Sequence, residues 1–412
     1  MNNKQFETAK MCLKIVTPIN ISDGIVLGAK DYLYDSRRQK VYFLNLHQWH
    51  MFIYKHMLLK KYESYLANFR DKQSLLEWLR MQGYDIDDVR TVITSEAQAT
   101  VNLMDNEKKK TLNDINRHIQ QPDGSLYVPG SSIKGVFRTA ILYSLLQKRQ
   151  DVKVKYWRQI QEKISSNYFN PYKDFKELMS DLENELLHTL RLLDGDIRSN
   201  NAVCSAMRGL KVSDLPIDSI DDEWNDLVCS AMRGLQVSDT YASRKMQTAI
   251  LQKVDGGLDK FVKASPKKLP IFRECMLPEA ELFFDVKIEK AVMSTIGISS
   301  VDDLLKATHS FFAAVTDLLQ QAFGKEYQEV FQGVAAGNMF LGGNTGFLSK
   351  TLLAMLAPDK DTAKNTIKVL LDKSFKNHKH LLRDKIIAPR TLKCTNYNGK
   401  LMLMGVAEVR KV

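Results

Sequence analysis

Alternation between apolar and polar positions predicts short β-strands at several places along the chain. The first predicted strand ends before Pro18, because proline cannot donate a hydrogen bond to a sheet. The last two flank Asn398-Gly399, a dipeptide that favours a tight hairpin turn. The predicted strands are residues 11–16, 41–46, 282–288, 391–397 and 401–409.

Apolar residues spaced three and four apart predict helices between these strands. A charged, amphipathic stretch at 151–193 is broken by Pro171, and we expect a helical insertion at about 151–195. Strands and helices alternate without a regular βαβ period, which favours the α+β class over a doubly wound sheet. The predicted helices are residues 48–66, 72–81, 132–147, 301–322 and 345–356.

An internal repeat stands out because residues 204–214 recur at 229–239, with Lys211 replaced by Gln236. The pattern occurs twice and then stops, so it does not indicate a solenoid. We expect a tolerated surface insertion with one redundant copy rather than a doubled binding site. The second copy is the better candidate for the ancestral one, because it runs directly into the segment before strand 282–288.

Composition and charge indicate the kind of partner and the cellular compartment that suit this protein. The 412 residues include 59 Lys+Arg and 48 Asp+Glu, and the net charge of +11 suits a polyanionic partner. The five cysteines are far apart and form no CxxC pair, which predicts reduced thiols in the cytoplasm. No apolar run is long enough for a signal peptide or a membrane span, so we expect neither secretion nor membrane contact.

The first segment with candidate binding chemistry is 127–142. Pro129-Gly130 predicts a turn, Ser131 or Ser132 is a candidate N-cap, and a helix follows. Free amides at a helix start attract anions, and Lys134 and Arg138 are one helical turn apart. This pattern predicts a phosphate cradle. The alternative is an ordinary capped helix with two solvated basic side chains.

The second segment is 341–351, where Gly342, Gly343 and Gly346 surround Asn344 and Thr345, and Lys350 follows. Three glycines in five positions allow positive φ and a close approach of the backbone to a ligand. No glycine stands directly before Lys350, so the segment does not match a nucleotide-binding Walker A loop. The alternative is a tight connection between packed elements.

Together the two segments resemble the RAMP superfamily of CRISPR RNA-binding proteins, in which Pro-Gly-Ser-Ser-Ile-Lys-Gly followed by Arg-Thr-Ala is characteristic of the Csm and Cmr branches. The likeness is strongest to the branch of the fifth Csm subunit of type III-A effector complexes. It touches both ends and the middle of the chain but does not cover 151–193. The further matching segments are 17–21 with Gly24, 237–239, 272–275 with Pro278, and 388–392.

The resemblance implies tandem ferredoxin-like (RRM-like) domains, which we place at 1–200, with the helical insertion, and at 201–412, with the duplicated segment. It also implies a non-catalytic subunit that caps the 3′ end of the crRNA, supports crRNA maturation and contacts neighbouring Csm backbone and small subunits, with host nucleases as further candidate partners. The aromatic signatures of RRM proteins are absent, so we expect backbone contacts rather than base stacking on a sheet. The implied RNA-binding residues are Gly130, Ser131, Ser132, Lys134, Arg138, Gly342, Gly343, Asn344, Thr345, Gly346 and Lys350, with Arg233, His378 and His380 as further candidates.

Two other functions remain open at this stage. His378 and His380, among several basic residues, could form the acid-base site of a RAMP endoribonuclease, although we favour a basic surface segment that helps to hold phosphate. Alternatively, the chain is a scaffold that binds only protein. The spacing of His47, His50 and His56 does not match a zinc helix, and we expect no metal and no cofactor.

Overall fold

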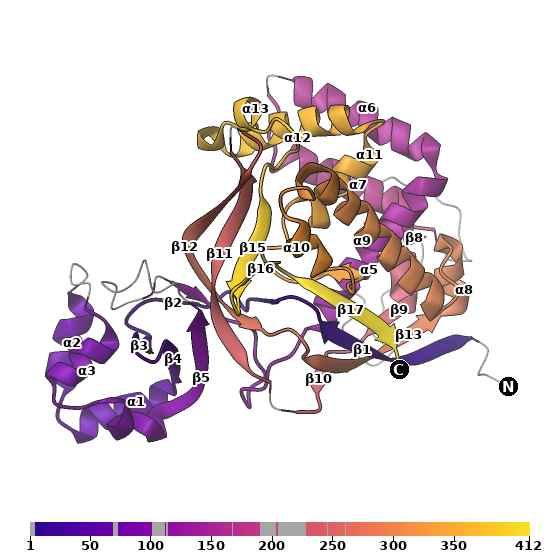
Figure 1. Ribbon diagram of the computed structural model, residues 1–412. Coiled ribbons are helices and arrows are strands. Elements are labelled where there is room, and N and C mark those ends of the chain that lie inside the picture. Colours follow the sequence, from indigo (N-terminus) through magenta and orange to yellow (C-terminus); the bar gives the residue numbers. More distant parts are fainter. Residues whose placement is uncertain are drawn as a thin grey trace.

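The structure is a computed structural model that describes residues 5–68, 73–100, 112, 114–166, 168–189, 203–204, 228–244, 246–259 and 261–412. It contains two large sheets, a two-stranded sheet, a small lobe and a layer of helices (Figure 1). The predicted α+β class with a helical insertion is confirmed.

The first sheet is built around β1 (Phe6–Ile15), which pairs antiparallel with β13 (Glu281–Glu289) and with β17 (Val406–Lys411). On the far side of β13 lie β9 (Leu235–Val237) and β10 (Tyr241–Ala242), and β14 (Met339–Phe340) extends the sheet beyond β17. The helices α5 (Gly130–Lys148) and α9 (Val301–Phe323) pack side by side against this sheet (Figure 1). The path β1, α5, β9, β13, α9, β17 with strand order β9-β13-β1-β17 is a ferredoxin-like unit.

The second sheet has its centre at β11 (Thr248–Leu258), which pairs antiparallel with β12 (Ala264–Met276) and β15 (Leu392–Tyr397), and parallel with β5 (Ile93–Thr100). One edge continues from β12 through β6 (Ile115–Asn116) to β2 (Val26–Leu27). The other continues from β5 through β4 (Lys40–Leu44) to β3 (Tyr32–Asp35), and β16 (Lys400–Leu403) follows β15.

Each sheet therefore takes strands from both sides of residue 200. The first combines β1 with β13 and β17, and the second combines β5 with β11. A division of the chain at residue 200 does not separate the two sheets, because the two ends of the chain close the same ferredoxin-like unit.

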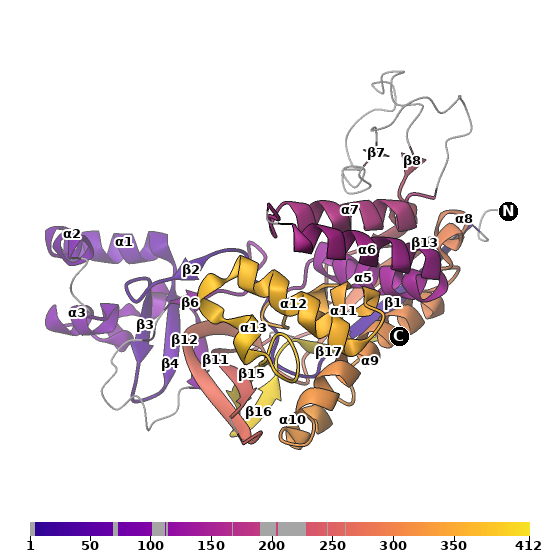
Figure 2. The same cartoon turned by 90° about the horizontal axis from the view of Figure 1, so that it is seen from above.

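The small lobe projects from the second sheet and carries α1 (Leu46–Lys55), α2 (Leu59–Ala67), α3 (Leu75–Met81) and the 3-10 segment Ile86–Val92 (Figure 2). Its core is aromatic and centres on Trp49, whose ring contacts those of Tyr62 and Trp78. The predicted helix 48–66 is wrong in one respect. It is split into α1 and α2 at Met57, which has a φ of 55° and ends the first helix.

The remaining helices cover the body on the side away from the small lobe. The predicted insertion forms α6 (Gln150–Ser165) and α7 (Asp174–Leu187), with Pro171 between them, and α6 packs against α11 (Leu353–Leu356) and α12 (Lys360–Ser374). Shorter helices are α8 (Lys290–Met293), α10 (Gln328–Gln332) and α13 (His380–Arg383). The predicted helix 345–356 is wrong. Ser349 bonds back to Thr345 and Gly346, and only a 3-10 turn, Leu348–Lys350, forms before α11.

The second copy of the repeat is an integral part of the first sheet. Ser230 caps the 3-10 turn Ala231–Gly234, and β9 then pairs with β13. A Cβ on Gly234 would lie 2.8 Å from the Val292 side chain, so only glycine fits there. The short strands β7 (Val203–Cys204) and β8 (Val228–Cys229) pair in parallel at the repeat offset, whereas residues 205–214 of the first copy lie outside the described residues.

Deleting residues 204–228 removes one repeat period and should leave the fold intact. Val203 repeats Val228, and their pairing holds them about one strand spacing, ~4.8 Å, apart. The junction therefore keeps both the local sequence and the connection to β9. We expect a melting temperature within about 2 °C of the full chain. Failure of the deletion variant to fold would show that the first copy is not redundant.

Candidate nucleic-acid interface

The two candidate segments of the sequence meet at one cleft of about 370 Å³. One wall is the face of α5 with Ser132, Gly135 and Thr139, and the opposite wall is formed by the glycine loop (residues 342–346), Ser349 and Lys350. The side chains of α9 line its inner part. Of the predicted RNA-binding residues, Ser132, Gly342, Gly343, Thr345 and Lys350 line this cleft. Gly130, Ser131, Lys134, Arg138, Asn344 and Gly346 lie outside its lining.

The glycine loop is held against the turn that follows β1. Gly342 has a φ of +86°, and a Cβ on it would lie 2.4 Å from the carbonyl oxygen of Asn20. The Gly343 N–H donates to that same oxygen at 2.7 Å. On its other side, Asn344 donates to the Met404 sulfur, and a Cβ on Gly405 would lie 2.2 Å from Thr345. Packing thus requires Gly342, as the alternative for this segment predicts, and these contacts fix the loop as a cleft wall.

At the N-terminus of α5, a carboxylate of the protein itself already accepts a hydrogen bond from the backbone. A Cβ on Gly130 would lie 2.3 Å from the Val237 carbonyl oxygen, and the Gly130 N–H donates to Asp239 Oδ1 at 2.7 Å. The predicted N-cap is wrong, because the helix begins at Gly130 with Pro129 at the capping position and no side-chain cap. The hydroxyls of Ser131 and Ser132 are consequently left without a hydrogen bond to the described residues.

Lys134 and Arg138 both have internal partners. Lys134 is 8% exposed, and its Nζ donates to the Leu235 carbonyl oxygen at 2.6 Å. Desolvation, with repulsion from Arg138, lowers the pKa of Lys134 to about 8. Arg138 pairs with Glu183 on α7 at 3.1 Å. In this arrangement both side chains are engaged inside the protein, and we therefore leave them out of the RNA contacts proposed below.

Replacing Lys134 by methionine tests this assignment. In the folded protein the ammonium loses its proton near pH 8, whereas the unfolded chain keeps it to about 10.5, so wild-type stability should gain on the order of 3 kcal/mol between these values. The methionine variant should not show this rise in stability with pH. The test is the difference in free energy of unfolding between the two proteins, measured with urea at each pH. RNA affinity should be unchanged. A large loss of affinity in a folded variant would place Lys134 at the RNA.

Four basic side chains gather beside the glycine loop, and we call Lys253, Arg273, Lys350 and Lys393 the basic cluster. Three lie on neighbouring strands β11, β12 and β15, and Lys350 follows the loop. A Cβ on Gly343 would lie 3.1 Å from Arg273 Nη1, and one on Gly346 would lie 3.6 Å from Lys393 Cγ. The cluster thus lies beside the glycine loop, and its Lys350 also lines the cleft.

This cluster carries excess positive charge. Among the described residues its one ion-pair partner is Asp255, 3.0 Å from Lys393 and 3.6 Å from Lys253. Desolvation and then repulsion from Arg273 lower the pKa of Lys350, and desolvation and then repulsion from Lys393 lower that of Lys253. Desolvation also lowers the pKa of Arg273, which donates to Asn20 Oδ1 at 2.8 Å. Four cations against one carboxylate leave a net positive charge, which suits an anion.

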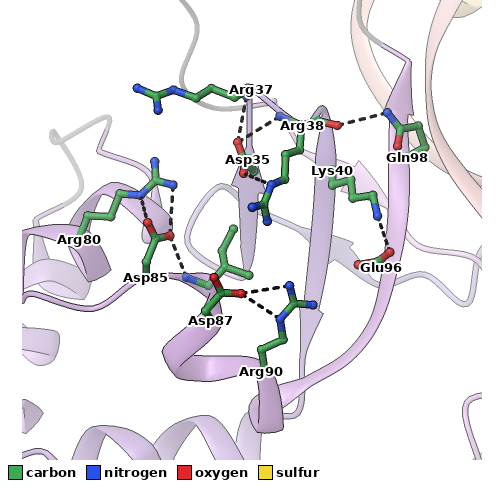
Figure 3. A network of polar contacts seen from close by, with 11 residues as sticks. Asp35, Arg37, Arg38, Lys40, Arg80, Asp85, Asp87, Arg90, Glu96 and Gln98 are labelled. Atoms are coloured by element: carbon green, nitrogen blue, oxygen red, sulfur yellow. Dashed lines mark hydrogen bonds and ion pairs between the residues drawn. The ribbon is translucent and has the colours of Figure 1, made fainter.

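The small lobe has a different electrostatic character. Around the β3–β4 hairpin most charges are paired, as in Arg80–Asp85, Arg90–Asp87 and Lys40–Glu96 (Figure 3). Arg37 points away from the other labelled side chains (Figure 3). Paired surface charges offer little net attraction to a phosphate chain. The basic cluster is therefore the better candidate for phosphate binding.

The histidine candidates lie outside the cleft lining. His380 is 6% exposed, and its Nδ1 lies 2.8 Å from Asp384 Oδ2. Asp384 is fully buried and also accepts from Arg390 at 2.7 Å. His378 is exposed and stacks on Phe375. Arg233 is exposed on the 3-10 turn before β9. Through Asp384 and Arg390, His380 is connected to the segment before β15.

The pattern within any single segment does not predict Lys253, Lys393, Arg273 or Asn20 as site residues. Lys253 and Lys393 lie on strands far apart in the sequence, and only the pairing of β11 with β15 brings them together. Arg273 and Asn20 fall in two of the shorter segments that matched the RAMP superfamily, 272–275 and 17–21. Those matches were the available signal for them.

None of the helices in the described part of the chain combines the length and the apolar character needed to cross a membrane. Within the same residues, no group of three or more His, Cys, Asp or Glu side chains is arranged to hold a metal ion.

Comparisons with known proteins agree with this geometry. A model of the RAMP superfamily matches residues 12–345. The "CRISPR system Cms protein Csm5" of Mycobacterium tuberculosis (strain CDC 1551 / Oshkosh) is 25% identical over 422 residues, which cover 98% of this chain and 97% of that protein. A protein of the same name from Enterococcus italicus is 27% identical over 143 residues, or 31% of this chain and 41% of that protein.

Two solved structures share the fold. One is a chain of a cryo-EM structure of a Csm-crRNA-target RNA ternary complex in a type III-A CRISPR-Cas system, with a TM-score of 0.61 and 18% identity, covering 98% of this chain and 100% of that chain. The other is the crystal structure of T. onnurineus Csm5, with a TM-score of 0.57 and 18% identity, covering 96% and 99%. Because the superfamily model matches most of the sequence, this chain belongs to the RAMP superfamily, and over nearly its whole length it is similar to Csm5 proteins.

Proposed function

We propose that this protein is the Csm5-type subunit of a type III-A CRISPR effector complex and that it binds the 3′ end of the crRNA without cutting it. One observation carries the proposal. Two glycine-containing segments some 200 residues apart form the walls of one cleft, and four basic side chains with a single carboxylate lie beside it. A ribose-phosphate strand combines the repeated negative charge and the narrow width that such a surface suits.

The names of the relatives support this assignment. The full-length relative is called Csm5, and the cryo-EM structure with the same fold contains crRNA and target RNA. The RNA contacts we propose are the cleft residues Ser132, Gly342, Gly343, Thr345 and Lys350, the exposed Ser131 next to them in the sequence, and Lys253, Arg273 and Lys393 in the basic cluster. Neighbouring Csm subunits and, during maturation, host nucleases are the proposed protein partners, in the cytoplasm.

Salt dependence tests the proposed mode of binding. Each released phosphate counterion contributes a slope of about −0.7 to log K against log salt for a single strand. With roughly three net positive charges at the cluster, we expect a slope of about −2 for single-stranded RNA, and similar affinities for unrelated sequences. Binding that does not change with salt would exclude phosphate neutralisation as its main source.

The enzymatic alternative makes a different prediction. His380 is buried and bonded to Asp384, which is itself paired with Arg390, so its ring has an internal structural role. We expect no cleavage of repeat RNA by the purified protein. A cleavage product that disappears in His380→Ala, with the fold retained, would support the endoribonuclease instead. A protein that assembles with its neighbours but binds no RNA would support the scaffold.

A further inference from the structure

The wall of the cleft contains a glycine that the fold does not require. Gly135 lies within α5, and a Cβ on it would meet no atom within 4 Å. By contrast, Gly130 and Gly342 are confined by backbone atoms at 2.3 and 2.4 Å. Glycine destabilises the interior of a helix relative to alanine. The space beside Gly135 is therefore kept open at a cost to the helix, at a point that lines the cleft.

The interior of the cleft is apolar and aromatic. Phe311 and Phe312 on α9 and Phe340 on β14 line it, and all three are at most 6% exposed. The rings of Phe312 and Phe340 are 4.8 Å apart. Buried aromatic side chains do not bind phosphate, so the interior and the rim of this cleft suit different parts of a ligand.

The rim is polar and adjoins the basic cluster. Ser132 and Lys350 lie on opposite sides, and neither side chain is hydrogen-bonded to the described residues. Gly343, also at the rim, is next to Arg273. A ligand that fits must present a flat apolar group to the interior and an anionic group to the rim. A single unstacked nucleotide has this arrangement, with its base inside and its phosphate outside.

We propose that the cleft holds one nucleobase turned out of the RNA strand, and that Gly135 provides the room for it. This inference rests on the proposed RNA binding and adds a site for one base to the contacts with the backbone. The volume of about 370 Å³ lies within the range of small-molecule sites, roughly 300–1,000 Å³. A base that is removed from water against apolar side chains contributes to affinity whatever its identity, so one position of the RNA should matter without a strict sequence preference.

Filling the space tests the proposal without disturbing the fold. Gly135→Leu places a side chain in the open volume, and Gly135→Ala is the matched control that improves the helix equally but leaves most of the space. Both variants should melt at or above the wild-type temperature, because a Cβ meets no atom there. Thermal unfolding confirms this before binding is measured.

The binding assay uses single-stranded RNAs that each lack one base while retaining the backbone. With wild type and Gly135→Ala, one position should lower affinity roughly tenfold when its base is removed, and the others should change little. Gly135→Leu should bind all of these RNAs with the same affinity. That affinity should equal the reduced affinity of the wild type for the one RNA whose missing base matters.

Each other outcome has a defined meaning. A flat profile for the wild type, with salt-dependent binding retained, overturns the nucleobase site and leaves the proposed function standing. Absence of any RNA binding by the wild type overturns the proposed function itself. If Gly135→Leu keeps the wild-type profile but fails to assemble with neighbouring subunits, the cleft receives a protein side chain and the inference is wrong.

Discussion

Replacing both Lys253 and Lys350 by methionine is expected to weaken binding of single-stranded RNA roughly a hundredfold, because each lost cation-phosphate contact removes about 1.4 kcal/mol. The salt slope should become shallower by about 1.4, or 0.7 for each contact. Methionine keeps the apolar length of each side chain, and Asp255 retains Lys393 at 3.0 Å as its partner. The fold should therefore be unaffected. Arg273 is less suitable for this test, because its guanidinium also holds Asn20.

The control for this experiment removes the same charge elsewhere. Lys155 and Lys176 are exposed on α6 and α7, outside the cleft and the basic cluster. Their double replacement by methionine should change affinity only slightly, through long-range electrostatics. Equal losses in the two double variants would mean that net charge alone drives binding and that the cluster has no special role.

Gly342→Ala should destabilise the protein by about 4 kcal/mol, which combines the strain of positive φ with a steric clash. The new Cβ would lie 2.4 Å from the Asn20 carbonyl oxygen. That oxygen also accepts from Gly343, so relief of the clash would separate the glycine loop from the turn after β1. We expect a melting temperature lower by roughly 8 °C, together with loss of RNA binding.

Alanine variants of two neighbouring glycines distinguish the strain of positive φ from the steric clash. Gly346 has a φ of +93°, but a Cβ on it would approach no atom closer than 3.6 Å, so Gly346→Ala should show the strain alone, about 2 kcal/mol. Gly343 has no positive φ, and its nearest neighbour is the end of the Arg273 side chain at 3.1 Å. Gly343→Ala should therefore have the smallest effect. The opposite order of stabilities would contradict the steric account of this loop.

Local sequence patterns correctly predicted elements that depend mainly on their own residues, such as the first strand and the last hairpin turn. Met11, Leu13 and Ile15 are fully buried in β1, and Asn398-Gly399 joins β15 to β16 with positive φ at both residues. The strand predicted at 401–409 is interrupted at Gly405, where the chain passes from the second sheet to the first. Apolar residues continue on both sides of this break, from Leu401 to Met404 and from Val406 to Ala407, so the pattern of hydrophobic residues does not indicate it.

The long hairpin β11–β12 was not predicted, because Gly256, Gly257, Pro266 and Pro270 interrupt its alternation and suggest loops. Lys134 was predicted to bind a phosphate group, and its burial was missed for a related reason. Spacing on one helix shows which residues share a face, but α5 is enclosed by β9 on one side and α9 on the other. The contacts of a lysine in such a helix depend on segments 100 residues away.

Crosslinking to 4-thiouridine RNA, followed by identification of the modified peptides, tests most directly whether the strand lies at the cleft. We expect crosslinks in peptides from both walls, residues 131–139 and 342–350, to be lost together when salt is raised. Crosslinks confined to the small lobe, residues 32–99, with both walls unmodified in a complex that still retains RNA, would contradict the account.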